Sequence, residues 1–185
     1  MSGRLGTIFA TGLIGVALIF SACGSDSSNT TGGSSDPEAN SNSTQRRYSQ
    51  TLYSVEMPAS WKLTLSDEET GIYLESIWQN PENSASILVE AQVPSPKSPI
   101  PGAESVRRHV SKSPGYRELA FGPISLDGRP AARWLFEASG KRQVAYFLSQ
   151  CEIGITVRGS ASLADFGSEA KTFRGAGSSV APRCG

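Results

Sequence analysis

Histidine and cysteine are scarce in this sequence, and their scarcity limits the chemistry that the chain can carry out. Its 185 residues include one histidine, His109, and three cysteines. A Ser-His-Asp or Cys-His catalytic site would have to use His109, which is predicted instead to lie exposed on a helix. The sequence also lacks a Gly-x-Ser-x-Gly segment and a glycine-rich phosphate loop. These absences argue against the common hydrolase and nucleotide-binding classes.

Charge of one sign is also lacking, because 17 lysines and arginines balance 17 aspartates and glutamates. Nucleic-acid binding needs clustered cationic surface, so the sequence predicts no nucleic-acid partner. A basic cluster and an acidic run are interpreted as solvated surface rather than as an anion patch or a calcium site. With few possible ligands, no metal and no cofactor are predicted. The cluster is Arg107, Arg108, Lys112 and Arg117, and the run is Asp67, Glu68 and Glu69.

The first two dozen residues have the pattern of a secretory signal. Arg4 supplies a positive charge, residues 5–20 are apolar or small apart from two threonines, and Ser21 and Ala22 precede Cys23. A membrane-spanning helix needs roughly 20 strongly apolar residues, and three glycines weaken this run. One interpretation is an ordinary signal peptide that is cleaved elsewhere, and the other involves Cys23.

Residues 18–23 resemble the lipobox of bacterial lipoproteins, although Phe20 stands where that family usually has leucine. The resemblance implies that residues 1–22 are a removed signal peptide. It also implies that Cys23 carries a thioether-linked diacylglycerol, often with an amide-linked acyl chain such as palmitate. Two or three acyl chains hold a protein on a membrane, here on the extracytoplasmic face.

Residues 24–46 consist mainly of Ser, Thr, Asn, Gly, Asp and Pro. Such a segment buries too little apolar surface to offset its ordering entropy, so residues 23–46 are predicted to be the lipidated cysteine and a flexible tether. Residues 47–185 are then predicted to be one globular domain.

Cys151 and Cys184 remain as an even pair in an exported domain, which predicts a disulfide. Geometry agrees, because a strand at 153–157 with its flanks runs for roughly 20 Å and a closing helix of about 17 residues returns over roughly 25 Å. Cys184 should therefore lie near Cys151.

Alternating apolar residues and turn signals predict an antiparallel sheet with helices on its faces, an α+β domain. A proline-rich loop is predicted at 94–102, and turns are predicted at residues 67–71, at Asp127-Gly128 and at Ser139-Gly140. The predicted strands are 53–57, 63–65, 72–78, 86–93, 116–121, 124–126, 131–138, 144–148 and 153–157, and the predicted helices are 103–112 and 163–179.

Three segments resemble the PsbP-like fold. Residues 53–61 resemble its opening strand, which is followed by Pro, two residues and Trp. Residues 126–131 resemble its mid-domain hairpin, and residues 164–180 resemble its last helix. The resemblance covers residues 48 to about 182 and includes actinobacterial cell-envelope lipoproteins of the Lpq type. It implies an α/β/α sandwich around a central antiparallel sheet, and an accessory or binding role rather than catalysis.

Trp61, Trp78 and Trp134 are candidates to line a ligand cleft, and core packing is the other interpretation. The favoured hypothesis is a non-enzymatic, membrane-anchored binding or accessory protein of the cell envelope, whose partner is an unidentified envelope protein or ligand. The alternatives are a lipid or glycan carrier with an internal apolar pocket, and a cell-wall hydrolase.

Overall fold

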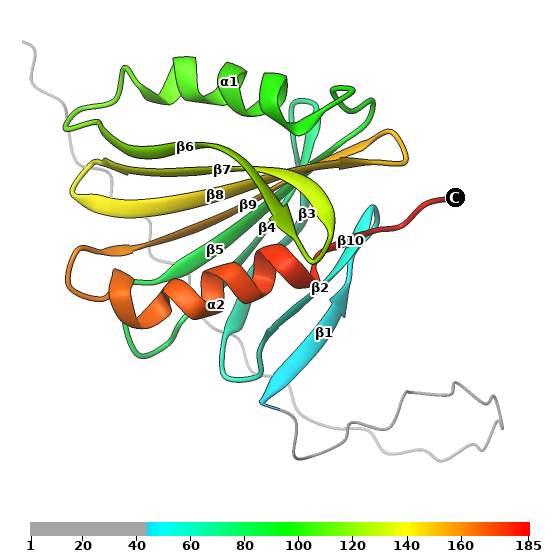
Figure 1. The fold of residues 1–185 in the computed structure, drawn as a ribbon. Coiled ribbons are helices and arrows are strands. Elements are labelled where there is room, and N and C mark those ends of the chain that lie inside the picture. The colour runs from blue at the N-terminus through cyan, green and yellow to red at the C-terminus, as the bar shows by residue number, and fades with distance from the viewer. Residues whose placement is uncertain (1–43) are drawn as a thin grey trace, which may run out of the picture. The chain divides into compact units, whose positions relative to one another are not determined.

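The structure, a computed structural model, describes residues 44–185, which form two antiparallel sheets and two helices (Figure 1). The predicted signal peptide, Cys23 and nearly all of the tether lie outside the described residues. Among the described residues, no helix has the length and apolar character needed to cross a membrane.

The larger sheet has seven antiparallel strands in the spatial order β3-β4-β5-β9-β8-β7-β6. Its two ends are therefore β3 and β6. Its strands are β3 (Lys62–Thr70), β4 (Tyr73–Gln79), β5 (Ser86–Gln92), β6 (Arg117–Leu126), β7 (Arg129–Ala138), β8 (Lys141–Gln150) and β9 (Ile153–Ser162).

The smaller sheet has three strands in the order β1-β2-β10. They are β1 (Gln45–Ser49), β2 (Tyr53–Pro58) and β10 (Ala181–Pro182). Neither β1 nor β10 was predicted, and β1 begins two residues inside the segment predicted to be the tether. Only two residues of β10 pair with β2, so its sequence pattern was too short to detect.

The two helices cover opposite faces of the larger sheet, as predicted for an α/β/α sandwich (Figure 1). Helix α1 (Pro99–Val110) packs on β7 and β8, and helix α2 (Phe166–Ser179) packs on β8, β9 and β2. A hydrophobic core lies under each helix. Strand β8 contributes side chains to both cores, because successive side chains of a strand point to opposite faces. Tyr146 belongs to the core under α2, and Phe147 belongs to the core under α1.

Two predictions about proline were wrong. Helix α1 begins at Pro99, inside the predicted loop, because the first N–H groups of a helix need no intrahelical partner and proline is tolerated there. Strand β6 runs unbroken through Pro123, where two strands were predicted. Proline fits because β6 is an edge strand, which leaves one side of its backbone unpaired.

Both edges of the larger sheet are irregular. The pairing of β3 shifts register twice, and the pairing of β6 shifts once, between Glu118 and Ala120. Of the turn predicted at residues 67–71, residues 67–70 instead continue β3, and the chain turns only at Gly71. Asp67 has a φ of 48° at one of the shifts, and its carboxylate accepts hydrogen bonds from the N–H and the hydroxyl of Thr51, each 2.8 Å long.

Three tight turns connect the strands from β6 to β9. The predicted turns at Asp127-Gly128 and Ser139-Gly140 are confirmed, with positive φ at all four residues. The third, between β8 and β9, is formed by Cys151 (φ 52°) and Glu152 (φ 62°). Positive φ at both central residues normally favours glycine or asparagine, so Cys151-Glu152 was not recognisable as a turn from its residue types.

Candidate binding clefts

Helix α1 leaves the β4-β5-β9 part of its sheet face uncovered, and an open cleft lies there. This α1 cleft has a volume of about 340 Å³. Its walls come from the sheet, from the N-terminal half of α1 and from the loop before α1. Lining residues include Tyr73, Glu90, Gln92, Pro99, Gly102 and Thr156.

The loop before α1 is fixed to the sheet by hydrogen bonds. The N–H of Ser95 donates to the carbonyl oxygen of Glu152 at 2.8 Å, and the hydroxyl of Ser149 donates to the carbonyl oxygen of Pro96. Gly154 leaves room for the neighbouring side chains, because a Cβ there would lie 3.3 Å from Cγ of Gln92. These contacts preform one wall of the α1 cleft.

Among residues 44–185, Glu90 is the only carboxylate that lines the α1 cleft. Burial raises the pKa of Glu90 above its ordinary value, Arg158 acts in the opposite direction, and Glu75 adds to the rise. Glu75 is the direct cross-strand neighbour of Glu90 in the β4–β5 pairing. Among the described residues, no cation lies within ion-pair distance of Glu90. Its carboxyl group is therefore available to bind a hydroxyl or amine group of a ligand.

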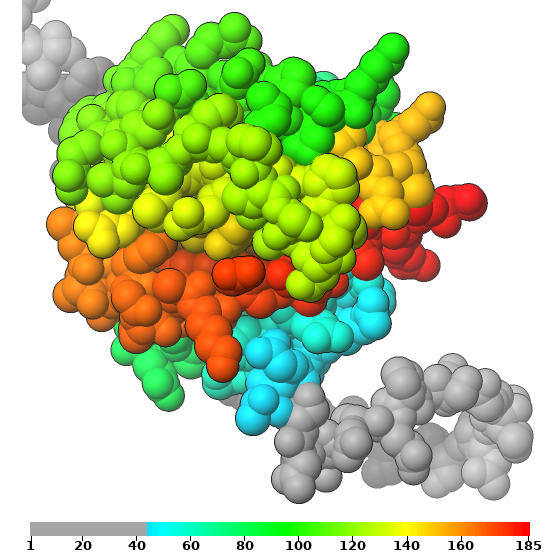
Figure 2. All heavy atoms as spheres, viewed as in Figure 1, coloured from blue at the N-terminus to red at the C-terminus, as the bar shows by residue number. Residues whose placement is uncertain are grey.

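A second open cleft, of about 470 Å³, lies on the opposite face of the sheet, where α2 leaves β6 and β7 uncovered. In this α2 cleft, apolar side chains and two arginines lie together. The lining residues include Ile124, Val144 and Phe166, with Tyr146, Arg133 and Arg174. Figure 2 shows α2 as an orange-red band bordered by the yellow-green surface of β6 and β7.

Close packing fixes α2 beside this cleft. A Cβ at Gly177 would lie 2.8 Å from Cδ2 of Tyr146, so glycine allows the helix to sit directly on that ring. At the end of α2, the guanidinium of Arg129 donates hydrogen bonds to the carbonyl oxygens of Ser178 and Val180. Arg129 begins β7, so it joins the end of α2 to the β6–β7 hairpin and preforms the cleft.

The structure does not bring the three tryptophans together in a cleft. Trp61 and Trp78 lie in the core under α2, and Trp134 lies in the core under α1. Trp61 contacts Phe173 edge to face, whereas Trp134 stacks on Phe136 with ring centroids 3.8 Å apart. Each is at most 4 % exposed, and none lines either cleft. Core packing accounts for all three.

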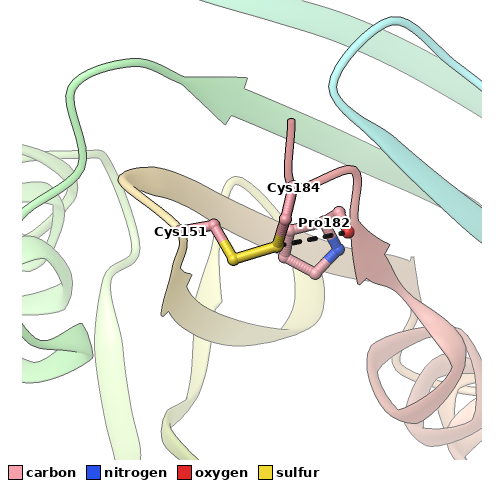
Figure 3. Close-up of a disulfide and its surroundings, with 3 residues drawn as sticks. All are labelled: Cys151, Pro182 and Cys184. Atoms are coloured by element: carbon pink, nitrogen blue, oxygen red, sulfur yellow. Dashed lines mark hydrogen bonds between the residues drawn. A yellow bond between two sulfur atoms is a disulfide. The ribbon is translucent and has the colours of Figure 1, made fainter.

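Cys151 and Cys184 form a disulfide with their Cα atoms 5.6 Å apart (Figure 3). The path that brings them together differs from the predicted one. β9 has ten residues and spans about 33 Å, whereas α2 has fourteen and returns only about 21 Å. Strand β10 and the residues after it complete the return, which leaves Sγ of Cys184 4.0 Å from the carbonyl oxygen of Pro182.

The basic cluster and His109 are surface features, as the sequence indicates. Arg107 pairs with Glu118, and Arg117 pairs with Glu137 at 2.8 Å, so two of the four cations are neutralised. His109 is exposed on α1 and lines neither cleft. Among the described residues, no group of three side chains is placed to hold a metal ion. The acidic run at 67–69 does not form such a group either.

Sequence reasoning missed Glu90, Arg133 and Arg174, which are the charged residues of the two clefts. A signal existed for two of them. Glu90 and Arg133 are each a charge inside a strand whose alternate residues are buried. A charge at such a position marks a sheet face that is only partly covered, but the sequence alone does not say which part.

The fold is PsbP-like, as shown by similarity to solved structures. The cyanobacterial PsbP protein (CyanoP) of Synechocystis sp. PCC 6803 is similar with a TM-score of 0.62 and 12% identity, over 82% of this chain and 98% of that one. LpqN of Mycobacterium tuberculosis, described as involved in cell envelope biogenesis, is similar with a TM-score of 0.50 and 10% identity, over 75% of this chain and 90% of that one. No family model matches the sequence, and no curated protein matches it.

Proposed function

We propose that this chain is a membrane-anchored, extracytoplasmic lipoprotein that acts as a non-enzymatic binding or accessory protein of the cell envelope. Its anchor is the lipid on Cys23, and its domain holds a small polar ligand in the α1 cleft. The observation that carries the binding role is the preformed α1 cleft with the half-buried, unpaired carboxyl group of Glu90.

The proposed location rests on the lipobox-like segment at 18–23 and on LpqN, a protein of similar fold that is described as involved in cell envelope biogenesis. The binding role rests on size and composition. Ligand sites are concave, mainly apolar and carry a few placed polar groups, and the α1 cleft combines Pro99 and Tyr73 with Glu90.

The binding role is tested by filling the α1 cleft. Ser105 is exposed on α1 and lines the cleft, so Ser105→Trp fills it from the solvent side without disturbing either core. The full chain is purified from its own envelope, and mass spectrometry identifies the small molecules that accompany it. A ligand that accompanies the wild type but not Ser105→Trp supports the proposal. His109→Trp is the matched control, because His109 is exposed on the same helix outside the cleft.

The anchor is tested separately. Cys23→Ala should leave an unprocessed precursor or release the protein from the membrane, and fractionation with intact-mass analysis measures this. A processed mature form of Cys23→Ala that stays on the membrane would contradict the lipid anchor and leave the binding test intact.

A further inference from the structure

The α2 cleft combines two features that a packed surface does not need. One is positive charge, from Arg133 on β7 and Arg174 on α2. The other is a concave apolar floor formed by Ile124, Val144 and Phe166. Among the described residues, no carboxylate lines this cleft and neither arginine forms an ion pair.

Local geometry brings the two arginines to the same ring. Arg133 is the direct cross-strand neighbour of Tyr146 in the β7–β8 pairing. Phe166, Ala170 and Arg174 follow one another at intervals of four, so they form one stripe of α2 facing the cleft. Gly177, three residues after Arg174, lies on Tyr146, so the charged end of the stripe is next to the same tyrosine.

The electrostatics of Tyr146 support this arrangement. Burial raises the pKa of Tyr146, while Arg133 and Arg174 both act to lower it. Both guanidinium groups therefore lie close enough to act on the same hydroxyl. Two carboxylates on neighbouring elements are already engaged. Glu137 pairs with Arg117 and Arg142, and Glu169 accepts hydrogen bonds of 2.8 Å from Asn80 and Asn83.

We propose that the α2 cleft binds an organic anion, whose phosphate or carboxylate group lies between Arg133 and Arg174 and whose apolar part lies on the floor of the cleft. Guanidinium groups form bidentate, charge-assisted hydrogen bonds with such anions, and these are stronger than neutral hydrogen bonds. The apolar floor favours an anion with a short hydrocarbon part over inorganic phosphate. This site is separate from the α1 cleft and does not depend on the function proposed for it.

Isothermal titration calorimetry of the full chain with hexyl phosphate tests the site. We expect binding of one molecule per chain, weaker binding of inorganic phosphate, and no binding of the neutral hexyl glucoside. Arg174→Gln and Arg133→Gln should each weaken the binding of hexyl phosphate by about tenfold or more. Ala170→Trp should abolish it, because Ala170 is exposed on α2 and its replacement fills the cleft.

Lys171→Gln is the matched control, because it removes the same charge from an exposed position on α2 outside the cleft. This variant should change the affinity less than twofold. Equal weakening by Lys171→Gln and Arg174→Gln would overturn the proposal, since binding would then follow overall charge. Equal binding of hexyl glucoside and hexyl phosphate would overturn it too, as would no binding of hexyl phosphate at millimolar concentration. Arg174→Gln and Ala170→Trp change exposed helix positions, so they test the site even if Arg133→Gln unfolds.

A competition experiment identifies the source of the anion. Vesicles of phosphatidylcholine containing phosphatidic acid are added to the complex with hexyl phosphate, and pure phosphatidylcholine vesicles serve as the control. Displacement by the first vesicles alone supports a lipid head group as the ligand, and no displacement by either supports a soluble anion. Equal displacement by both vesicles would overturn recognition of the anionic group.

Discussion

The two clefts lie on opposite faces of one sheet and have a common origin, but their charges are opposite. Each helix is too narrow to cover seven strands, so α1 leaves β4, β5 and β9 open and α2 leaves β6 and β7 open. The α1 cleft contains the carboxyl group of Glu90, and the α2 cleft contains the guanidinium groups of Arg133 and Arg174. One sheet between two helices thus provides two clefts with different chemistry.

The largest expected effect comes from removing the disulfide at the turn between β8 and β9. This turn is in contact with structures beside both clefts, so the experiment asks whether the two clefts share one support. Cys151 bonds to the segment after α2, and Glu152 holds the loop beside the α1 cleft. The bridged cysteines are 33 residues apart, so the double variant Cys151→Ser/Cys184→Ser should lose about 3 to 4 kcal/mol of unfolding free energy.

Urea denaturation of the full chain measures this loss, and the wild type in reductant should show the same change. A loss below about 1 kcal/mol would mean that the disulfide is not the common support.

The next largest effect is the loss of stability when a glycine of β9 is replaced by alanine, which we compare between the two faces of the strand. A Cβ at Gly159 would overlap the ring of Phe173, which packs against that glycine from α2. Gly159→Ala should therefore destabilise the domain by about 3 kcal/mol. Gly154→Ala is the control on the opposite face, where a Cβ would lie 3.3 Å from the flexible side chain of Gln92, and should cost less than about 1 kcal/mol. Equal losses in denaturation experiments would contradict the tighter packing under α2.

A smaller effect is the pH dependence of the unfolding free energy, which we expect from the carboxyl group of the α1 cleft. The folded state raises the pKa of Glu90 above its ordinary value of 4.5, so it retains a proton that the unfolded chain releases. The unfolding free energy of the wild type therefore falls as pH rises from that ordinary value through the raised one. Glu90→Gln removes this loss, and its Tm relative to wild type should be higher at pH 7 than at pH 4.

Glu104→Gln is the control for this pH dependence, because Glu104 is exposed on α1 outside the cleft. A difference between Glu90→Gln and wild type that does not grow with pH would show that the environment of Glu90 is not as described.

The smallest effect concerns the turn itself. Glu152 has a φ of 62°, a conformation that costs a residue with a Cβ about 1 to 2 kcal/mol and costs glycine little. Replacing Glu152 by glycine removes this cost, but glycine also has greater conformational freedom in the unfolded chain, which offsets part of the stabilisation. Glu152→Gly should therefore stabilise the domain by about 0.5 to 1 kcal/mol, seen as a small rise in the denaturation midpoint. Glu82→Gly, on a surface loop, should give no such rise.

The fold was predictable from the sequence because its signals are local. Alternating residues such as Ile87, Val89 and Ala91 define strand β5, and Asp127-Gly128 defines the turn between β6 and β7. The α+β class and the PsbP-like fold are confirmed. Strand β10 was missed because its two residues pair only with the distant β2, and the start of α1 was missed because proline was taken as a breaker at every position.

The clefts could not be predicted, because they depend on where each helix lies on the sheet. Trp134 and Arg133 are adjacent in sequence, yet one is a core residue and the other lines the α2 cleft. Periodicity places them on opposite faces but does not say how far α2 extends over β7. Large aromatic residues were therefore the predicted cleft residues, whereas the charges that line the clefts are apparent only in the folded chain.

The irregular edges of the larger sheet have a consequence for crowding. A protein confined to a membrane surface meets its own copies at high local concentration, and exposed regular edge strands would join into continuous sheets. Here the last part of β3 contains Asp67, Glu68 and Glu69, register shifts interrupt its pairing, and β6 contains Pro123. Charges, bulges and proline are features that prevent strand addition. The irregular edges should therefore keep copies of the chain from polymerising at the high local concentration that the proposed membrane anchor would give.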